Sequence, residues 1–212
     1  MDLHAKIRAM GKIAGSVIDI NRVEDRLTRW DGAGKNRPKI SRQIFFSFSI
    51  PAEQEESIKE HFLEQIQIAF QILINQGYSI VAFHSEEKDA EACKSFVDVF
   101  KDQAIQYVGG YENSSMINLL STSEFAIVMD EECLVYALLL DKPFTALFIN
   151  KDLLEESGLQ DLFTDQEGFN AGVLLQKVDY LETNNTKIMD AIVRVFDESN
   201  ETGELTVGVN AG

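Results

Sequence analysis

Short apolar runs alternate with amphipathic segments along most of this chain, and this alternation restricts its fold more than any other feature. Runs such as AIVM and TALFI are typical of strands that are buried on both faces. The segments between them repeat their apolar residues with the helical period of 3.6. The expected strands are 44–50, 78–83, 105–108, 125–129 and 144–149, and the expected helices are 53–76, 88–101, 113–121 and 131–140. This order predicts an α/β fold with a single Rossmann-like parallel sheet and flanking helices.

The two ends of the chain differ from this pattern. We expect residues 1–42 to form a basic helical arm and linker, residues 43–197 the α/β domain and residues 198–212 an acidic flexible tail. Within the arm, 2–30 has a heptad-like apolar stripe that predicts a helix, and the glycine-rich stretch 31–38 reads as a linker. The arm helix either packs on its own domain or joins a second copy or a partner protein, and the stripe fits both alternatives.

Charge separates the arm from the rest of the chain. The 212 residues carry a formal charge of −16. Residues 1–42 hold ten basic and five acidic residues, a charge of +5, which leaves −21 on the remainder. This strongly acidic remainder of the chain repels nucleic acid phosphates and anionic membrane surfaces. We therefore expect neither of these as a partner. The basic arm is expected to dock on an acidic surface, its own or that of a second copy.

Other features point to a cytoplasmic protein without a metal or cofactor. No run approaches the roughly 18 apolar residues that span a bilayer, and the first ten residues lack a secretory apolar region. The cysteines, Cys93 and Cys133, lack the spacing of metal ligands, and we expect buried, reduced thiols.

Polar side chains that follow the predicted strands are the candidate site residues, because open α/β sheets bind ligands at the carboxyl ends of their strands. His84 is either a proton shuttle or a histidine bonded to a neighbouring loop. Gly109 and Gly110 either cradle an anion at a helix N-terminus or form an ordinary turn. Asn150 and Lys151 follow the last strand as candidate ligand-binding residues.

Three carboxylates follow the strand at 125–129, namely Asp130, Glu131 and Glu132. Acidic residues at the start of a helix interact favourably with its dipole, which explains them without a ligand. They would repel a phosphate or carboxylate ligand. A divalent cation is the other possible occupant, but adjacent residues at a helix start seldom converge on one ion.

Four segments carry a resemblance to a known family: IFFSFSI at 44–50, NQGYSIVAFHSEEKDAE at 75–91, NLLSTSEFAIVM at 118–129 and ALLLDKPFTALFINKDLLEESGLQDLF at 137–163. Together they resemble the C-terminal lobe of the polysaccharide pyruvyl transferases. That family resembles two-lobed GT-B glycosyltransferases and moves the enolpyruvyl group of phosphoenolpyruvate onto a sugar as a ketal. The resemblance implies a phosphoenolpyruvate or sugar-nucleotide ligand. It matches His84, as acid/base, and Asp89 and Lys151, as ligand-binding residues, to the family's motif.

The chain also departs from the family. Where the family typically has an Arg-x-His pair, this chain has Asp130 and Glu132, which reverses the local charge at the catalytic positions. Residues 1–42 are also too few to replace the family's N-terminal lobe. Three functions follow: an inactive or accessory member in glycan or cell-envelope metabolism, an active pyruvyl or glycosyl transferase, and a non-enzymatic module that dimerises through the N-terminal helix.

Overall fold

The structure is a computed structural model that describes residues 7, 19–34, 38–50, 55–101, 104–109, 113–147, 173–175, 186 and 188–193. Its centre is a parallel sheet, and its strands are β1 (Ile40–Phe48), β2 (Ser79–His84), β3 (Ile105–Tyr107), β4 (Ser123–Val128), β5 (Phe144–Leu147) and β6 (Val173–Leu175). The order across the sheet is β3-β2-β1-β4-β5-β6. The predicted Rossmann-like α/β fold is therefore confirmed.

The strand order reverses between β1 and β4, which are hydrogen-bonded neighbours. In the register, Phe48 of β1 pairs with His84 of β2, and Ser47 pairs with Val128 of β4. The carboxyl ends of these three strands therefore lie level at one edge of the sheet. In open α/β sheets this reversal point is where ligands bind.

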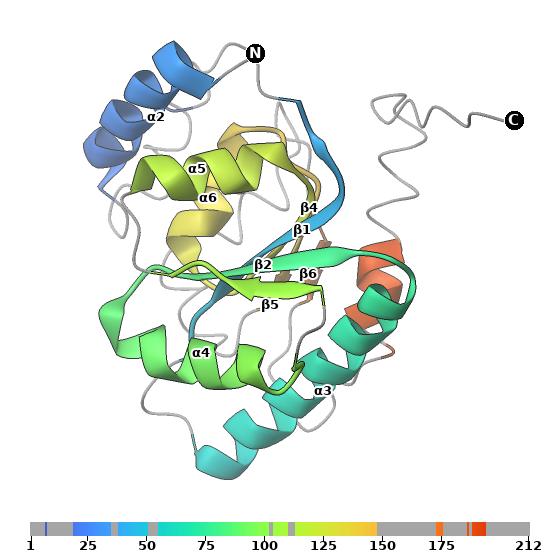
Figure 1. Cartoon of the computed structure of the whole chain (residues 1–212). Coiled ribbons are helices and arrows are strands. Elements are labelled where there is room, and N and C mark those ends of the chain that lie inside the picture. Colours follow the sequence, from blue (N-terminus) through green and yellow to red (C-terminus); the bar gives the residue numbers. More distant parts are fainter. Residues whose placement is uncertain are drawn as a thin grey trace, which may run out of the picture.

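Helices cover both faces of the sheet (Figure 1). The described helices are α2 (Ile20–Gly34), α3 (Glu56–Asn75), α4 (Ala90–Asp98), α5 (Asn113–Thr122) and α6 (Glu131–Leu139), with a short 3-10 helix, Glu87–Asp89, before α4. One face packs against α2, α5 and α6, and the other against α3, α4 and the described residues 188–192. Gly77, with φ +89°, follows α3 in the left-handed conformation expected of a helix-terminating glycine.

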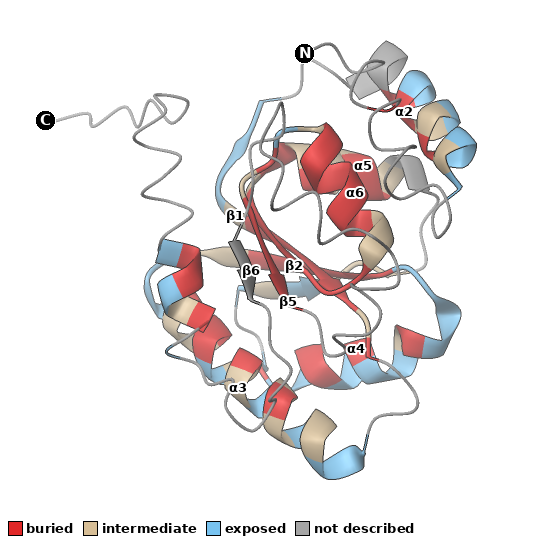
Figure 2. Cartoon of the chain, turned by 180° about the vertical axis from the view of Figure 1, so that it is seen from behind, coloured by how far each residue is buried: buried red, intermediate tan, exposed pale blue. Residues whose placement is uncertain are grey.

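The sheet itself forms the core, and Figure 2 shows the second half of β1 and most of β4 buried. Alternate residues of β1 face opposite layers. Phe45 lies on the α2, α5 and α6 side, while Phe46 and Phe48 lie on the α3 and α4 side. There Phe46 packs edge-on against Phe70 of α3, with ring centroids 4.7 Å apart. Continuous apolar runs are thus needed because both faces are covered.

The described part of the arm packs on its own domain. Val23, Leu27 and Trp30 of α2 are buried in the same cluster as α5 and α6. The Trp30 indole N–H also donates to Asn118 Oδ1 of α5 at 3.0 Å. These contacts account for the apolar stripe of α2 within one chain. Association through residues 2–30 stays a prediction.

Some predicted boundaries are wrong. The linker expected at 31–38 is helical as far as Gly34, because α2 continues through its glycines. The first strand begins at Ile40 instead of 44, and its first three residues are exposed, including Arg42 at φ 58° beside a register shift. Ser41, Arg42 and Gln43 are polar, so this stretch lacks the apolar signal of a strand. Strand β6 is not among the five strands expected from the sequence. The acidic tail at 198–212 lies outside the described residues.

Candidate functional site

An open pocket of about 410 Å³ lies at the carboxyl edge of the sheet. Its walls come from the start of α2, the residues after β2 and the start of α6. Eight described residues line it, and six of these are charged: Asp19, Arg22, Glu86, Asp130, Glu131 and Glu132. Two of the predicted catalytic residues, Asp130 and Glu132, therefore meet in one pocket.

Asp130 begins α6, because one of its carboxylate oxygens replaces the missing hydrogen-bond partner of a backbone amide. The Cys133 N–H donates to Asp130 Oδ1 at 2.8 Å, which confirms the predicted capping role. The other oxygen, Oδ2, is buried, and the side chains of Ser47 and Cys133 also bond to this carboxyl group. Burial raises the pKa of Asp130, and this outweighs the hydrogen bonds from Cys133 and Ser47, which lower it.

The start of α2 is capped in the same way. The backbone N–H groups of Asn21 and Arg22 both lie 3.2 Å from Asp19 Oδ1. Two helix N-termini thus face this pocket, and each is occupied by a carboxylate of the chain itself. A helix N-terminus is otherwise a natural site for a phosphate or carboxylate ligand.

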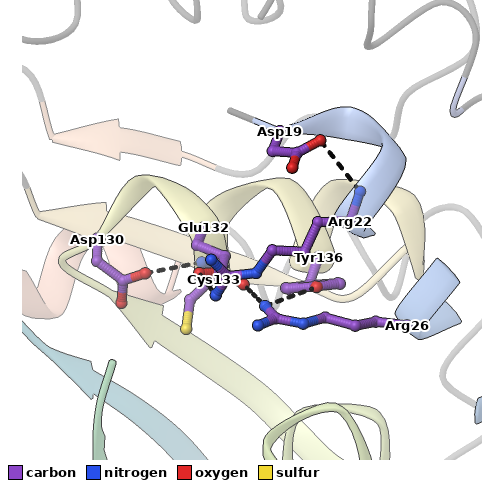
Figure 3. A network of polar contacts seen from close by, with 7 residues as sticks. All are labelled: Asp19, Arg22, Arg26, Asp130, Glu132, Cys133 and Tyr136. Atoms are coloured by element: carbon purple, nitrogen blue, oxygen red, sulfur yellow. Dashed lines mark hydrogen bonds and ion pairs between the residues drawn. The ribbon is translucent and has the colours of Figure 1, made fainter. Parts of the chain in front are cut away.

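Glu132 joins α6 to the arm helix (Figure 3). Arg26 Nη1 donates to Glu132 Oε1 and lies 3.4 Å from the Tyr136 hydroxyl. Arg22 Nη2 lies 3.4 Å from Glu132 Oε2. The pocket's guanidinium group is therefore paired with a carboxylate. The basic arm docks on the acidic surface of its own chain, one of the two expected outcomes.

Glu131 lies between other acids. Burial raises its pKa, and the negative charges of Asp130 and Glu86 raise it further. The pocket therefore concentrates negative charge beyond what its arginine balances.

His84, the third predicted catalytic residue, belongs to a different cluster. Its Nδ1 lies 3.0 Å from the Glu86 carbonyl oxygen, and its Nε2 lies 2.7 Å from the Tyr107 hydroxyl. Because a carbonyl only accepts, Nδ1 is the donor to Glu86, and Nε2 is hydrogen-bonded to the Tyr107 hydroxyl. A side chain on Gly109 would overlap the His84 ring, so Gly109 serves close packing here. The structure thus matches the loop-bonded alternative for His84.

Asp89, a predicted ligand-binding residue, is 4% exposed and lies outside the residues that line the pocket. Burial raises its pKa, while hydrogen bonds from Ser49 and the backbone of Ile50 lower it. It therefore ties the end of β1 to the start of α4. The remaining predicted ligand-binding residues, Gly110, Asn150 and Lys151, lie outside the described residues.

The sequence prediction missed Asp19, Arg22 and Glu86 as pocket residues. The signal for Asp19 was present, because an aspartate directly before the helical segment INRVEDRL is a common helix start. Nothing local indicated that Arg26 would meet Glu132, which is 106 residues away.

Both cysteines are buried and free, as predicted. Burial raises the pKa of the Cys93 thiol to about 12 and that of Cys133 well above its usual value. Within the described ranges, no group of three or more His, Cys, Asp or Glu side chains could hold a metal ion. Likewise, no helix in the described part of the chain is long and apolar enough to cross a bilayer.

The fold of this chain is that of one GT-B-type lobe, as several solved structures indicate. Heptosyltransferase II of E. coli superposes with a TM-score of 0.55 at 14% identity, over 84% of this chain and 53% of the enzyme. UDP-GlcNAc 2-epimerase of Methanocaldococcus jannaschii gives 0.52 at 12% identity, over 91% and 46%. A family 9 glycosyl transferase of Veillonella parvula gives 0.50 at 10% identity, over 84% and 51%.

This chain thus spans about half the length of these proteins. At such identities the likeness establishes the fold alone. No family model matches the sequence, and no curated protein does.

Proposed function

We propose that this chain is a polysaccharide pyruvyl transferase-like protein of glycan metabolism whose pocket no longer takes an anionic donor. In this role it is inactive or accessory. The glycosyltransferase-like fold supports the link to glycans. The observation that carries the loss of donor binding is the arrangement of Asp130 and Glu132.

Asp130 supplies its own carboxylate to the N-terminus of α6, where a phosphate of a donor would otherwise bind. Glu132 meanwhile occupies the guanidinium groups of Arg22 and Arg26. A phosphate about 4 Å from an ionised carboxylate is repelled by roughly 4 kcal/mol at the effective dielectric of a protein surface. The pocket thus disfavours a bound anion in two ways. Its carboxylates repel the anion, and they also occupy the hydrogen-bond donors that the anion would need.

The hydrogen bonds of His84 support the same proposal. A general acid or base needs a ring nitrogen within reach of the substrate. Both nitrogens of His84 are already bonded to protein atoms, and His84 is not among the residues that line the pocket. Proton transfer through His84 would first require breaking its bond to Tyr107.

The test is thermal unfolding of the full chain with 5 mM ADP, UDP or phosphoenolpyruvate. A donor site with a Kd near 50 μM would stabilise the native state by about 2.7 kcal/mol, or roughly 5–10 °C for a chain of this size. We expect no such shift. A shift of that size in the wild type, or ketal formation from phosphoenolpyruvate, would overturn the proposal.

Glu132→Gln sharpens this experiment. It removes the negative charge that pairs with Arg22 and Arg26 while keeping the shape of the side chain. We expect the variant to gain affinity for phosphate or ADP. Glu64→Gln is the matched control, because Glu64 is exposed on α3, away from the pocket. If both variants gain affinity equally, net charge alone is responsible and the proposed role of Glu132 is wrong.

A further inference from the structure

We propose that Lys142 is a proton-sensitive clamp on the end of α5, and that its protonation state controls how firmly the arm helix α2 docks on the domain. Lys142 lies at the amino edge of the sheet and is not among the residues that line the acidic pocket. The clamp is therefore independent of the proposed function.

The first support is the place of the Lys142 side chain. Only 4% of this residue is exposed. Its ammonium group donates to the Ser121 carbonyl oxygen at 3.0 Å and to the Ser123 carbonyl oxygen. These carbonyls belong to the last turn of α5 and the first residue of β4, whereas Lys142 itself lies between α6 and β5. One side chain therefore ties two successive crossover connections of the sheet together.

The backbone on either side of Lys142 is also held. The preceding residue, Asp141, lies at φ 50°, a left-handed conformation that is uncommon outside glycine. The Lys142 N–H donates to the Ala137 carbonyl of α6 at 2.9 Å, and the Pro143 carbonyl accepts from the Ala126 N–H of β4 at 3.0 Å. Full exposure of the ammonium group to water therefore requires this region to open locally.

The second support is a chain of hydrogen bonds from the clamp to the arm. The hydroxyl of Ser121, whose carbonyl binds Lys142, donates to the Asn118 carbonyl at 3.0 Å. The Asn118 side chain accepts from the Trp30 indole N–H of α2 at 3.0 Å. Because α2 packs on α5, opening of the end of α5 weakens the surface that holds the arm.

The groups around Lys142 make the clamp sensitive to protons. Both of its hydrogen-bond acceptors are uncharged carbonyl groups, so burial disfavours the ammonium form. Lys39, just before β1, repels the ammonium group, and Glu124 of β4 attracts it. Glu124 also accepts a hydrogen bond from the Arg42 N–H, and Asp141 is exposed. Burial, together with Lys39, outweighs Glu124 and lowers the pKa of Lys142 to about 7.

Lower pH should favour opening of the clamp. The open form exposes the Lys142 amine, whose ordinary pKa is 10.5, whereas the closed form keeps a proton on it only below about pH 7. Between these two values opening takes up a proton. The equilibrium constant for opening should therefore rise about 50-fold from pH 9 to pH 7 and change little below pH 6.

The experiment measures hydrogen exchange by NMR in the full chain from pH 7 to pH 9, corrected for the intrinsic exchange rate. Trp30 is the sole tryptophan in the sequence, so its indole N–H is a single probe for release of the arm. The amide of Ile127, buried in β4, is the reference for unfolding of the whole domain. We expect the indole N–H to be less protected than this amide, and its protection to be about 50-fold lower at pH 7 than at pH 9.

Two variants separate a proton-sensitive clamp from a merely structural lysine. Lys142→Met keeps most of the stem and removes the titrating group, so protection of the indole N–H should no longer depend on pH, whatever the stability of the variant. Lys94→Met is the matched control, because Lys94 is exposed on α4, and it should keep the wild-type pH dependence.

The titration of the Lys142 side chain, followed by NMR, gives a second test that does not need Lys142→Met to fold. We expect a midpoint near pH 7 in the wild type. Lys39→Met should move this midpoint upward, because it removes a repelling charge, and Glu124→Gln should move it downward, because it removes an attracting one.

Three results would overturn the proposal. A Lys142 midpoint above about pH 9.5, close to that of an ordinary lysine, would remove the proton sensitivity. Equal protection of the Trp30 indole and the Ile127 amide would mean that the arm opens only when the whole domain unfolds. A pH dependence that persists in Lys142→Met would assign the titrating group to another residue.

Discussion

Two clusters of polar residues lie at the same edge of the sheet. They differ in how completely contacts within the protein fill their space and balance their charges. The histidine cluster, formed by His84, Tyr107 and Gly109, is closed: both ring nitrogens of His84 are bonded, and Gly109 packs against the ring. The acidic pocket, lined by Asp130 and its neighbours, is open, and five carboxyl groups line it against one guanidinium group. A place after a strand end is thus not enough to make a binding site. Free volume and unmatched charge distinguish the two.

The largest effect is expected from Gly109→Ala, which tests whether the histidine cluster is structural. The new Cβ would overlap the His84 ring and the Tyr107 hydroxyl, so ring or backbone must move. Overpacking of this kind typically costs about 1–3 kcal/mol. We expect the free energy of unfolding, measured with urea, to fall by about 3 kcal/mol.

A double-mutant cycle provides the control for Gly109→Ala. His84→Ala removes the ring, so adding Gly109→Ala to it should cost much less than in the wild type. The coupling between the two substitutions then measures their contact. If Gly109→Ala is equally costly with and without the ring, the close approach to His84 is not the reason for this glycine.

The next effect concerns the contact between the arm and the pocket. Arg26→Met keeps most of the apolar stem of the side chain but removes the charge that meets Glu132 and the Tyr136 hydroxyl. The Arg26 and Glu132 side chains are 19% and 28% exposed, so this pair is partly shielded from water. We expect a loss of about 1 kcal/mol of stability, smaller at high salt, measured by urea unfolding.

Arg29→Met on the same helix is the matched control. Arg29 pairs with Asp25 within α2, and both side chains are largely exposed. Exposed pairs four residues apart contribute about 0.3–0.5 kcal/mol. If the two variants lose the same stability, the long-range pair with Glu132 is no stronger than a surface pair, and the arm is held by its apolar residues alone.

Most of the fold was predictable from the sequence because the periods of strands and helices are local. The order of strands and helices at 44–149 follows from these periods. The capping role of Asp130 is a local signal as well, because this residue directly precedes a helix. Strand β6 was not among the expected strands.

The candidate site was less predictable, because its contacts join distant residues. Asp130 and Glu132 were found from their place after a strand, but their partners on α2 were not. Lys142 is a further example, at the opposite edge of the sheet. A lysine before a proline reads as exposed, yet it is buried and donates to the Ser121 and Ser123 carbonyls, and burial lowers its pKa to about 7.

The smallest expected effect, Asp130→Asn, tests the unmatched charge of the pocket directly. Asparagine keeps the cap, so stability at pH 7 should stay within about 1 kcal/mol of the wild type.

The sign of the pH dependence is the decisive result. The pKa of Asp130 is higher in the folded state than in the unfolded state, so the folded state keeps the Asp130 proton to higher pH. The stability that this proton contributes is present at low pH and is lost as pH rises from about 4 through the folded pKa. The variant lacks that loss, so its stability relative to the wild type should improve between pH 4 and pH 7 in urea titrations. A relative loss over this range would mean that the Asp130 carboxylate is satisfied when ionised, and the contrast between the two clusters would disappear.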